Sequence, residues 1–124
     1  MTTPPLVLVV DDDRDIRDSL VELLEDQGYR AAGAANGLEA LEVLRTGQTL
    51  PCVILLDLMM PMMDGWEFRE AQLQNPAWTQ VPVIVISAYG DVAAKASSLE
   101  VEHLRKPLAL RTLLEAVRRH CPGP

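Results

Sequence analysis

The sequence predicts an α/β protein built on a doubly wound, five-stranded parallel sheet with helices on both faces. Two observations indicate this fold class. Continuous apolar runs of strand length occur at 6–10, 53–56 and 83–86, and such runs are typical of central strands that are covered on both sides. Segments with the helical spacing of apolar residues separate these runs, and that alternation favours βαβ units around a parallel sheet.

Two weaker strand candidates, 29–34 and 101–104, have the mixed polarity that suits the edges of a sheet. Placing the three apolar strands in the middle permits the strand order 2-1-3-4-5, with right-handed crossovers that put helices on both faces. In this order the winding reverses between strands 1 and 3, where ligands bind beyond the carboxyl ends of the strands. The loops that begin at Asp11 and Asp57 meet at this point.

Five helical segments are expected between and after the strands, each bounded by residues typical of helix ends. They cover about 16–28, 36–47, 65–74, a short alanine-rich stretch after Asp91, and 110–120. At the start of the second, Asn36 followed by Glu39 resembles a capping box. We expect one domain over 1–124, with a core at about 6–120 and loose tails at 1–5 and 121–124.

Composition narrows the class of protein. The chain has 124 residues and a formal net charge of −7, so direct binding to nucleic acid is disfavoured, whereas a cation or a basic partner is favoured. It shows neither a secretory signal nor the roughly 20 consecutive apolar residues that a membrane span requires. We therefore expect a soluble cytoplasmic protein. Cys52 and Cys121 lie far apart in sequence, and we expect two reduced thiols.

Acidic residues follow two of the central strands. Asp11 and Asp12 come directly after the first strand, and Asp57 ends the third. Two carboxylates about 4 Å apart repel by about 4 kcal/mol at an effective dielectric constant near 20. A hard divalent cation such as Mg²⁺ relieves that repulsion and prefers oxygen ligands. For Asp13 we expect only a role in capping the helix that follows.

Ser87 ends the fourth strand and Lys106 follows the fifth, so both lie at the same rim as Asp57. Together these residues supply metal ligands, a nucleophilic oxygen, a hydroxyl donor and a positive charge. Phosphoryl transfer needs these parts, because its catalysis rests mainly on positioning and on stabilising charge.

Four motifs resemble the receiver domains of response regulators, the CheY-like superfamily with a flavodoxin-like fold. The resemblance extends from Leu6 to about His120. The motifs are Val-Val-Asp-Asp-Asp at 9–13, Leu-Asp-Leu-Met-Met-Pro-Met-Met-Asp-Gly at 56–65, Ile-Ser-Ala at 86–88 and Arg-Lys-Pro at 105–107. Each motif is weak by itself, whereas all four in order on the expected elements are specific.

The resemblance implies a role in two-component phosphorelay signalling. Asp57 would accept a phosphoryl group from a sensor histidine kinase or a histidine phosphotransfer protein. Asp11, Asp12, Asp57 and the backbone carbonyl of Met59 would hold Mg²⁺. Lys106 and Ser87 would contact the phosphoryl oxygens, and the only chemistry expected is phosphorylation and dephosphorylation of the protein itself, not turnover of a separate substrate.

By the same resemblance, phosphorylation would shift the surface formed by the fourth helix, the fifth strand and the fifth helix. That surface would bind a downstream protein, and a phosphorylation-dependent homodimer is left open. The switch position before Lys106 is usually aromatic in the family, but this chain has His103. The stretch from Ser87 to Lys106 is also short and lacks the glycine expected before the fifth strand.

Three other functions remain as alternatives. A degenerate receiver would act only as a protein-interaction module. A Mg²⁺-dependent aspartyl phosphatase would need a second aspartate two residues beyond Asp57, where this chain has Met59. A flavodoxin-like cofactor protein would need a first loop that cradles phosphate, whereas the acidic side chains at 11–13 would repel it.

Overall fold

The structure is a computed structural model that describes residues 4–47, 49–58, 60, 62–87, 102–105 and 109–121. The expected fourth helix and the site residues Met59 and Lys106 lie outside the described residues, as does the side chain of Ser87. The elements are β1 (Leu6–Val10), α1 (Arg14–Asp26), β2 (Arg30–Ala34), α2 (Gly37–Thr46), β3 (Val53–Asp57), α3 (Gly65–Leu73), β4 (Val83–Ser87), β5 (Glu102–Arg105) and α5 (Leu110–His120).

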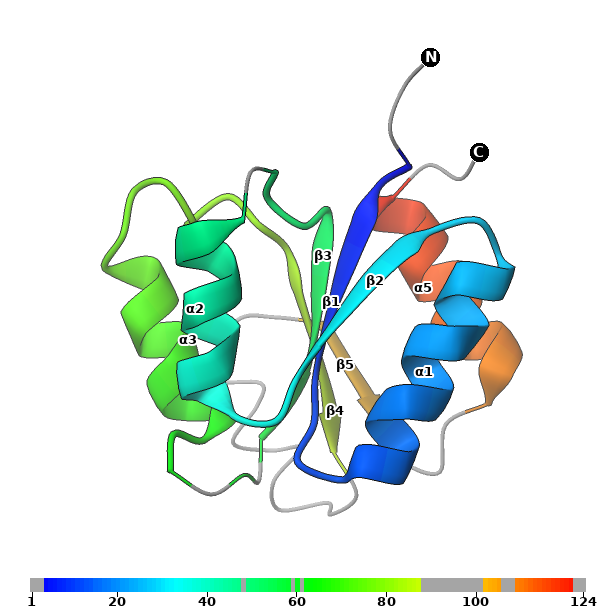
Figure 1. Cartoon of the computed structure of the whole chain (residues 1–124), viewed down its shortest axis with the longest axis horizontal. Helices are drawn as coiled ribbons and strands as arrows, with labels where there is room; N and C mark the ends of the chain where they lie inside the picture. Colours follow the sequence, from blue (N-terminus) through cyan, green and yellow to red (C-terminus); the bar gives the residue numbers. More distant parts are fainter. Residues whose placement is uncertain are drawn as a thin grey trace.

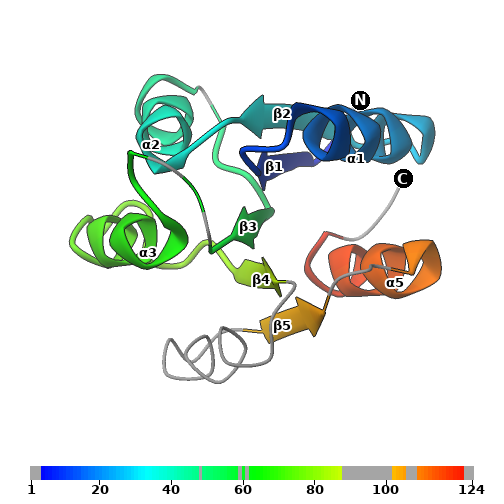
Figure 2. The same cartoon turned by 90° about the horizontal axis from the view of Figure 1, so that it is seen from below.

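The five strands form one sheet in the order β2-β1-β3-β4-β5, as the sequence predicted (Figure 1). Every pair of neighbours is parallel, and Leu8 pairs with both Ala32 and Ile54. The winding reverses between β1 and β3, because the chain adds β2 on one side of β1 and the later strands on the other. β1 and β3 end side by side at the edge that faces the viewer in Figure 2.

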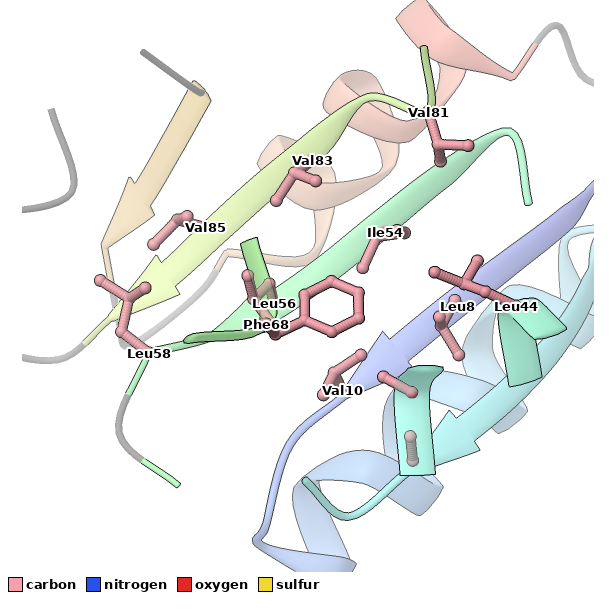
Figure 3. Packing of buried hydrophobic residues seen from close by; sticks show 12 residues of the cluster. Leu8, Val10, Leu44, Ile54, Leu56, Leu58, Phe68, Val81, Val83 and Val85 are labelled. Carbon is pink, nitrogen blue, oxygen red and sulfur yellow. The ribbon is translucent and has the colours of Figure 1, made fainter. Parts of the chain in front are cut away.

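Among the residues that the structure describes, α1 and α5 lie on one face of the sheet, and α2 and α3 lie on the other (Figure 2). Alternate residues of a strand point to opposite faces, so each central strand contributes to two cores. Val7, Val9 and Val53 pack toward α1 and α5. Leu8 and Ile54 pack toward α2 and α3, where Figure 3 shows the Phe68 ring projecting over β3.

The predicted difference between central and edge strands is confirmed in the described residues. Every residue of β3 is buried, whereas β2 is buried only at Ala34 and three residues of β5, at 102–104, are partly exposed. The bounds differ slightly from the sequence prediction, since β3 and β4 each extend by one residue to include Asp57 and Ser87, and β2 starts at Arg30. None of the helices in the described ranges is long and apolar enough to cross a membrane.

Side-chain caps begin three of the helices. Asp13 accepts hydrogen bonds from the backbone N–H groups of Asp15 and Ile16, which confirms its predicted capping role. Asn36 likewise caps α2 through the N–H of Glu39, but the Glu39 side chain accepts from Ala35, so the expected capping box is only half formed. The full capping box lies instead at Asp64 and starts α3.

The structure holds a closed disulfide, so the prediction of two separate reduced thiols was wrong for this state. Cys52 and Cys121 form a disulfide, with their Cα atoms 5.5 Å apart. Cys121, which we expected to begin a loose tail, is fully buried. The two residues are distant in sequence, but β3 starts at the edge of the sheet where α5 ends, so the parallel topology brings them together (Figure 1).

Candidate functional site at the carboxyl edge of the sheet

The site lies where β1 and β3 end next to each other. In the register of this strand pair Val10 lies opposite Leu56. The next residues along the two strands are Asp11 and Asp57, so the parallel pairing itself brings the two carboxylates to one place. The predicted proximity of Asp11 and Asp57 is confirmed.

Asp12 completes a group of three carboxylates. One oxygen from each of Asp11, Asp12 and Asp57 lies within 4.8 Å of the others. Asp11 and Asp57 are buried, with exposed fractions of 4% and 8%, whereas Asp12 is exposed. The group therefore has two inner carboxylates that solvent scarcely reaches and one outer carboxylate at the surface.

Several hydrogen bonds hold the loop that carries Asp11. Its backbone N–H donates to the carbonyl of Ala34 at 3.0 Å, which extends the ladder between β1 and β2. Its Oδ1 accepts from the N–H of Asp13 at 2.9 Å, and its carbonyl oxygen accepts from the guanidinium of Arg17 at 2.8 Å. The Asp13 N–H thus orients the Asp11 side chain, and Arg17 of α1 holds the Asp11 backbone.

The loop after β3 is fastened at both of its ends. The N–H of Gly65 donates to the carbonyl of Leu58 at 3.0 Å, which closes the turn between β3 and α3. The N–H of Gly37 donates to the carbonyl of Met63 at 2.9 Å, which ties this loop to the start of α2. The end of β3, and with it Asp57, is therefore supported by contacts from α2 and α3.

The donor set fits a small, hard cation. Two ligands on a Mg²⁺ octahedron lie about 3 to 4 Å apart when the metal–oxygen bonds are about 2.1 Å long. Carboxylate oxygens within 4.8 Å of each other need only small side-chain rotations to meet that spacing. When bound, the cation would neutralise part of the negative charge on an incoming phosphoryl group. Asp11, Asp12 and Asp57 are the described residues that could hold it.

The other predicted site residues are placed only in part. Ser87 is the last residue of β4, one position beyond Ile86, which pairs with Asp57. Its backbone thus reaches the predicted rim, while the position of its hydroxyl is outside the described residues. His103 lies on the edge strand β5 opposite Val85 and is partly buried. The predicted roles of Lys106 and Met59 fall on residues outside the described ranges and stay predictions.

Sequence reasoning missed Arg17. This residue fastens the Asp11 carbonyl, and its side-chain stem covers Gly33 on β2. In the sequence Arg17 is one of several charged residues on an amphipathic helix. Its contacts with Asp11 and Gly33 become visible only once α1 is packed beside β2. The capping box of Asp64 and Glu67, in contrast, has the readable spacing of an acidic cap followed three residues later by glutamate.

We expect Arg17→Ala to lower the free energy of unfolding by about 1.5 to 3 kcal/mol, because a hydrogen bond from a charged donor is lost. Arg14→Ala is the matched control on the same helix. Its side chain is 83% exposed and forms an ion pair with the exposed Asp18, so we expect a change of about 0.5 kcal/mol or less. Urea unfolding monitored by tryptophan fluorescence measures both, and equal losses would contradict a special role for Arg17.

Comparison with known proteins identifies the family. The family model described as the response regulator receiver domain matches residues 7–118. The chain belongs to this family. Response regulator MprA from Mycobacterium sp. (strain KMS) is 36% identical over 118 residues, which cover 93% of this chain and 50% of that protein. MprA from Mycobacterium ulcerans is 37% identical over 115 residues, with 90% and 48% covered.

Solved structures agree with this assignment. A response regulator receiver protein from Pseudomonas putida superposes with a TM-score of 0.86 at 32% identity, covering 96% of this chain and 99% of that one. The chemotaxis protein CheY4 of Vibrio cholerae gives a TM-score of 0.82 at 29% identity, with 95% and 99% covered. The receiver domain described here spans about half the length of the curated relatives it matches.

Proposed function

We propose that this receiver domain is a phosphoacceptor whose Asp57 is phosphorylated with the help of Mg²⁺. The observation that carries the proposal is the meeting of Asp11, Asp12 and Asp57 at one edge of the sheet. A degenerate receiver would have no need for three carboxylates whose charges repel each other unless a cation lies among them. The buried position of Asp57 also limits the access of water to the reacting oxygen.

In the proposed reaction a carboxylate oxygen of Asp57 attacks the phosphorus of a phosphohistidine. A new O–P bond forms and the N–P bond breaks. The imidazole nitrogen leaves with the bonding electrons and then takes a proton. Asp11 and Asp12 hold the cation, and the family resemblance assigns the backbone carbonyl of Met59 as a further ligand. By the same resemblance, Lys106 and Ser87 bind the phosphoryl oxygens.

We propose a sensor histidine kinase or a histidine phosphotransfer protein as the phosphoryl donor, in the cytoplasm. The new group adds about −1.5 to −2 charges at the edge of the sheet, and it would shift the population between two conformations. The signal would leave through the region between β4 and β5, through β5 with His103, and through α5, toward a downstream protein or a second receiver. No separate substrate is turned over.

Intact-mass spectrometry after incubation with acetyl phosphate and Mg²⁺ tests this function. We expect wild type to gain one phosphoryl group and Asp57→Asn to gain none. Asp11→Asn and Asp12→Asn should be phosphorylated much more slowly, and chelation of Mg²⁺ should stop the reaction. Asp15→Asn is the matched control, since Asp15 is an acidic residue of α1 that lies outside the cluster.

Two results would contradict the proposal. One is a wild-type protein that gains no phosphoryl group, which would leave a receiver that acts only as an interaction module. The other is an Asp57→Asn variant that still gains one, which would move the acceptor to another residue. Steady release of phosphate from unrelated phosphomonoesters would instead favour a phosphatase.

A further inference from the structure

We propose that Cys52 and Cys121 form a reversible thiol–disulfide site, reduced in the resting cytoplasm and closed by peroxide. This site lies at the amino-terminal edge of the sheet, opposite the acidic cluster (Figure 1). It joins the segment that enters β3 to the residue that ends α5. The proposal concerns oxidation of the receiver and does not depend on phosphorylation at Asp57.

The backbone positions of Cys52 and Cys121 suit a disulfide. The Cα atoms of the two cysteines are 5.5 Å apart, in the middle of the range that disulfides adopt. The N–H of Cys52 donates to the Leu6 carbonyl at 2.8 Å, and the N–H of Cys121 donates to the Val117 carbonyl at 2.8 Å. These bonds hold both residues independently of their sulfur atoms, so the two thiols stay close when the disulfide is opened.

The reduced form, in which the disulfide is open, also keeps hydrogen bonds at both cysteines. The Cys52 sulfur lies 3.2 Å from the Leu6 carbonyl oxygen, a distance at which a reduced thiol donates a hydrogen bond. The Cys121 carbonyl accepts from the hydroxyl of Tyr29 at 3.2 Å, and this buried bond involves no sulfur. The fold therefore supplies an acceptor for the reduced Cys52 thiol and keeps the Tyr29 bond in both redox states.

The different exposure of the two cysteines assigns their roles. Cys52 is partly exposed, whereas Cys121 has an exposed fraction of 0%. Cys52 is thus the thiol that a peroxide reaches first. Its thiolate attacks one peroxide oxygen, the O–O bond breaks, and the products are a sulfenic acid and hydroxide. The Cys121 sulfur then attacks the Cys52 sulfur and releases the oxygen as water, so two thiols and one H₂O₂ give one disulfide and two waters.

The structural consequence falls on α5. The N-cap residue before the helix is Ala109, and alanine offers no side-chain acceptor for the first N–H groups of the helix. Its far end is held by the Tyr29 hydrogen bond and by an ion pair between Arg119 and Glu102 at 2.5 Å. A covalent bond at Cys121 adds to these contacts, so oxidation should protect the last turn of α5 against local opening.

The experiment compares reduced protein with protein treated with H₂O₂. We expect the oxidised protein to lose the mass of two hydrogens as a monomer, and a non-reducing digest to join the peptides that contain Cys52 and Cys121. The closed form should melt about 10 °C higher. Amide hydrogen exchange at the end of α5 should slow, and reduced glutathione at cytosolic concentration should reverse both changes.

Three variants separate the roles. Cys121→Ala should trap Cys52 as a sulfenic acid that dimedone labels, and Cys52→Ser should react with peroxide much more slowly. Asp57→Asn should form the disulfide like wild type, so a failure of the phosphorylation proposal is distinguishable from a failure of this one. A disulfide that does not form, that forms between chains, or that resists reduced glutathione would overturn the proposal.

Discussion

Gly65→Ala is expected to destabilise the domain by about 3 kcal/mol, at the upper end of the cost of overpacking a well-packed site. A β-carbon at this position would lie 2.7 Å from Leu58 Cδ2, 2.8 Å from Leu58 Cα and 2.9 Å from the carbonyl oxygen of Asp57. Two of these neighbours are backbone atoms, which cannot rotate away. The end of β3 must therefore move, and Asp57 moves with it.

The same substitution should affect the reaction as well as stability. A displacement of about 1 Å at a reacting group can cost about 100-fold in rate, so we expect phosphorylation of Gly65→Ala by acetyl phosphate to slow at least about tenfold. Urea unfolding measures the first effect, and the rate of mass gain at a temperature where the variant is folded measures the second.

Gly33→Ala is the control for Gly65→Ala. Gly33 lies on the edge strand β2, and the three atoms nearest to a β-carbon there would all belong to the Arg17 side chain, with Cδ at 3.1 Å. The Arg17 stem needs to give way by only a few tenths of an ångström, which can leave its bond to the Asp11 carbonyl in place. Because alanine also suits a strand interior better than glycine, we expect a loss of at most about 1 kcal/mol, well below that of Gly65→Ala. Equal losses in the two variants would show that the close approach at Leu58 does not determine the stability of the loop.

Phe68→Ala is expected to lower the free energy of unfolding by about 3 to 5 kcal/mol. The Phe68 ring is fully buried, and it packs from α3 against residues of β1 and β3 that include Val10 and Leu56 (Figure 3). Its removal leaves a cavity that the rigid central strands cannot close. A domain of this size is typically stable by only about 5 to 15 kcal/mol, so the variant should lose a large share of its stability.

Leu73→Ala on the same helix is the matched control. Leu73 is 51% exposed, so its truncation removes far less buried apolar area, and we expect a loss below about 1 kcal/mol. Trp66 and Trp78, which pack against the same core, report unfolding in urea for both variants. If Phe68→Ala lost no more than Leu73→Ala, packing of α3 on the sheet would not be a main source of stability.

The strand order and the acidic cluster could be predicted because both depend on short-range signals. Buried parallel strands are continuous apolar runs, and the carboxyl ends of parallel strands meet at one edge. Once 6–10 and 53–56 are recognised as neighbours, Asp11 and Asp57 must lie close together. The register that pairs Val10 with Leu56 makes this proximity definite.

The remaining features depend on how helices pack, which no local pattern encodes. Arg17 matters because α1 lies beside β2 and above the Asp11 loop. The pairing of Cys52 with Cys121 depends on where α5 ends relative to the start of β3. Sequence separation is a poor guide in such cases, since a doubly wound fold returns the end of each helix to the amino-terminal edge of the sheet.

The disulfide also makes the oxidised chain a covalent ring with a tail. The ring closes over a sequence separation of 69 residues and carries β3, α3, β4, β5 and α5. The tail carries β1, α1, β2 and α2, and with them Asp11 and Asp12. A protease that cuts one peptide bond within the ring would leave a single covalently joined molecule, whereas a cut in the tail would release a fragment. Denaturing gel electrophoresis without reductant would distinguish the two outcomes. Asp57 lies within the ring, whereas Asp11 and Asp12 lie in the tail.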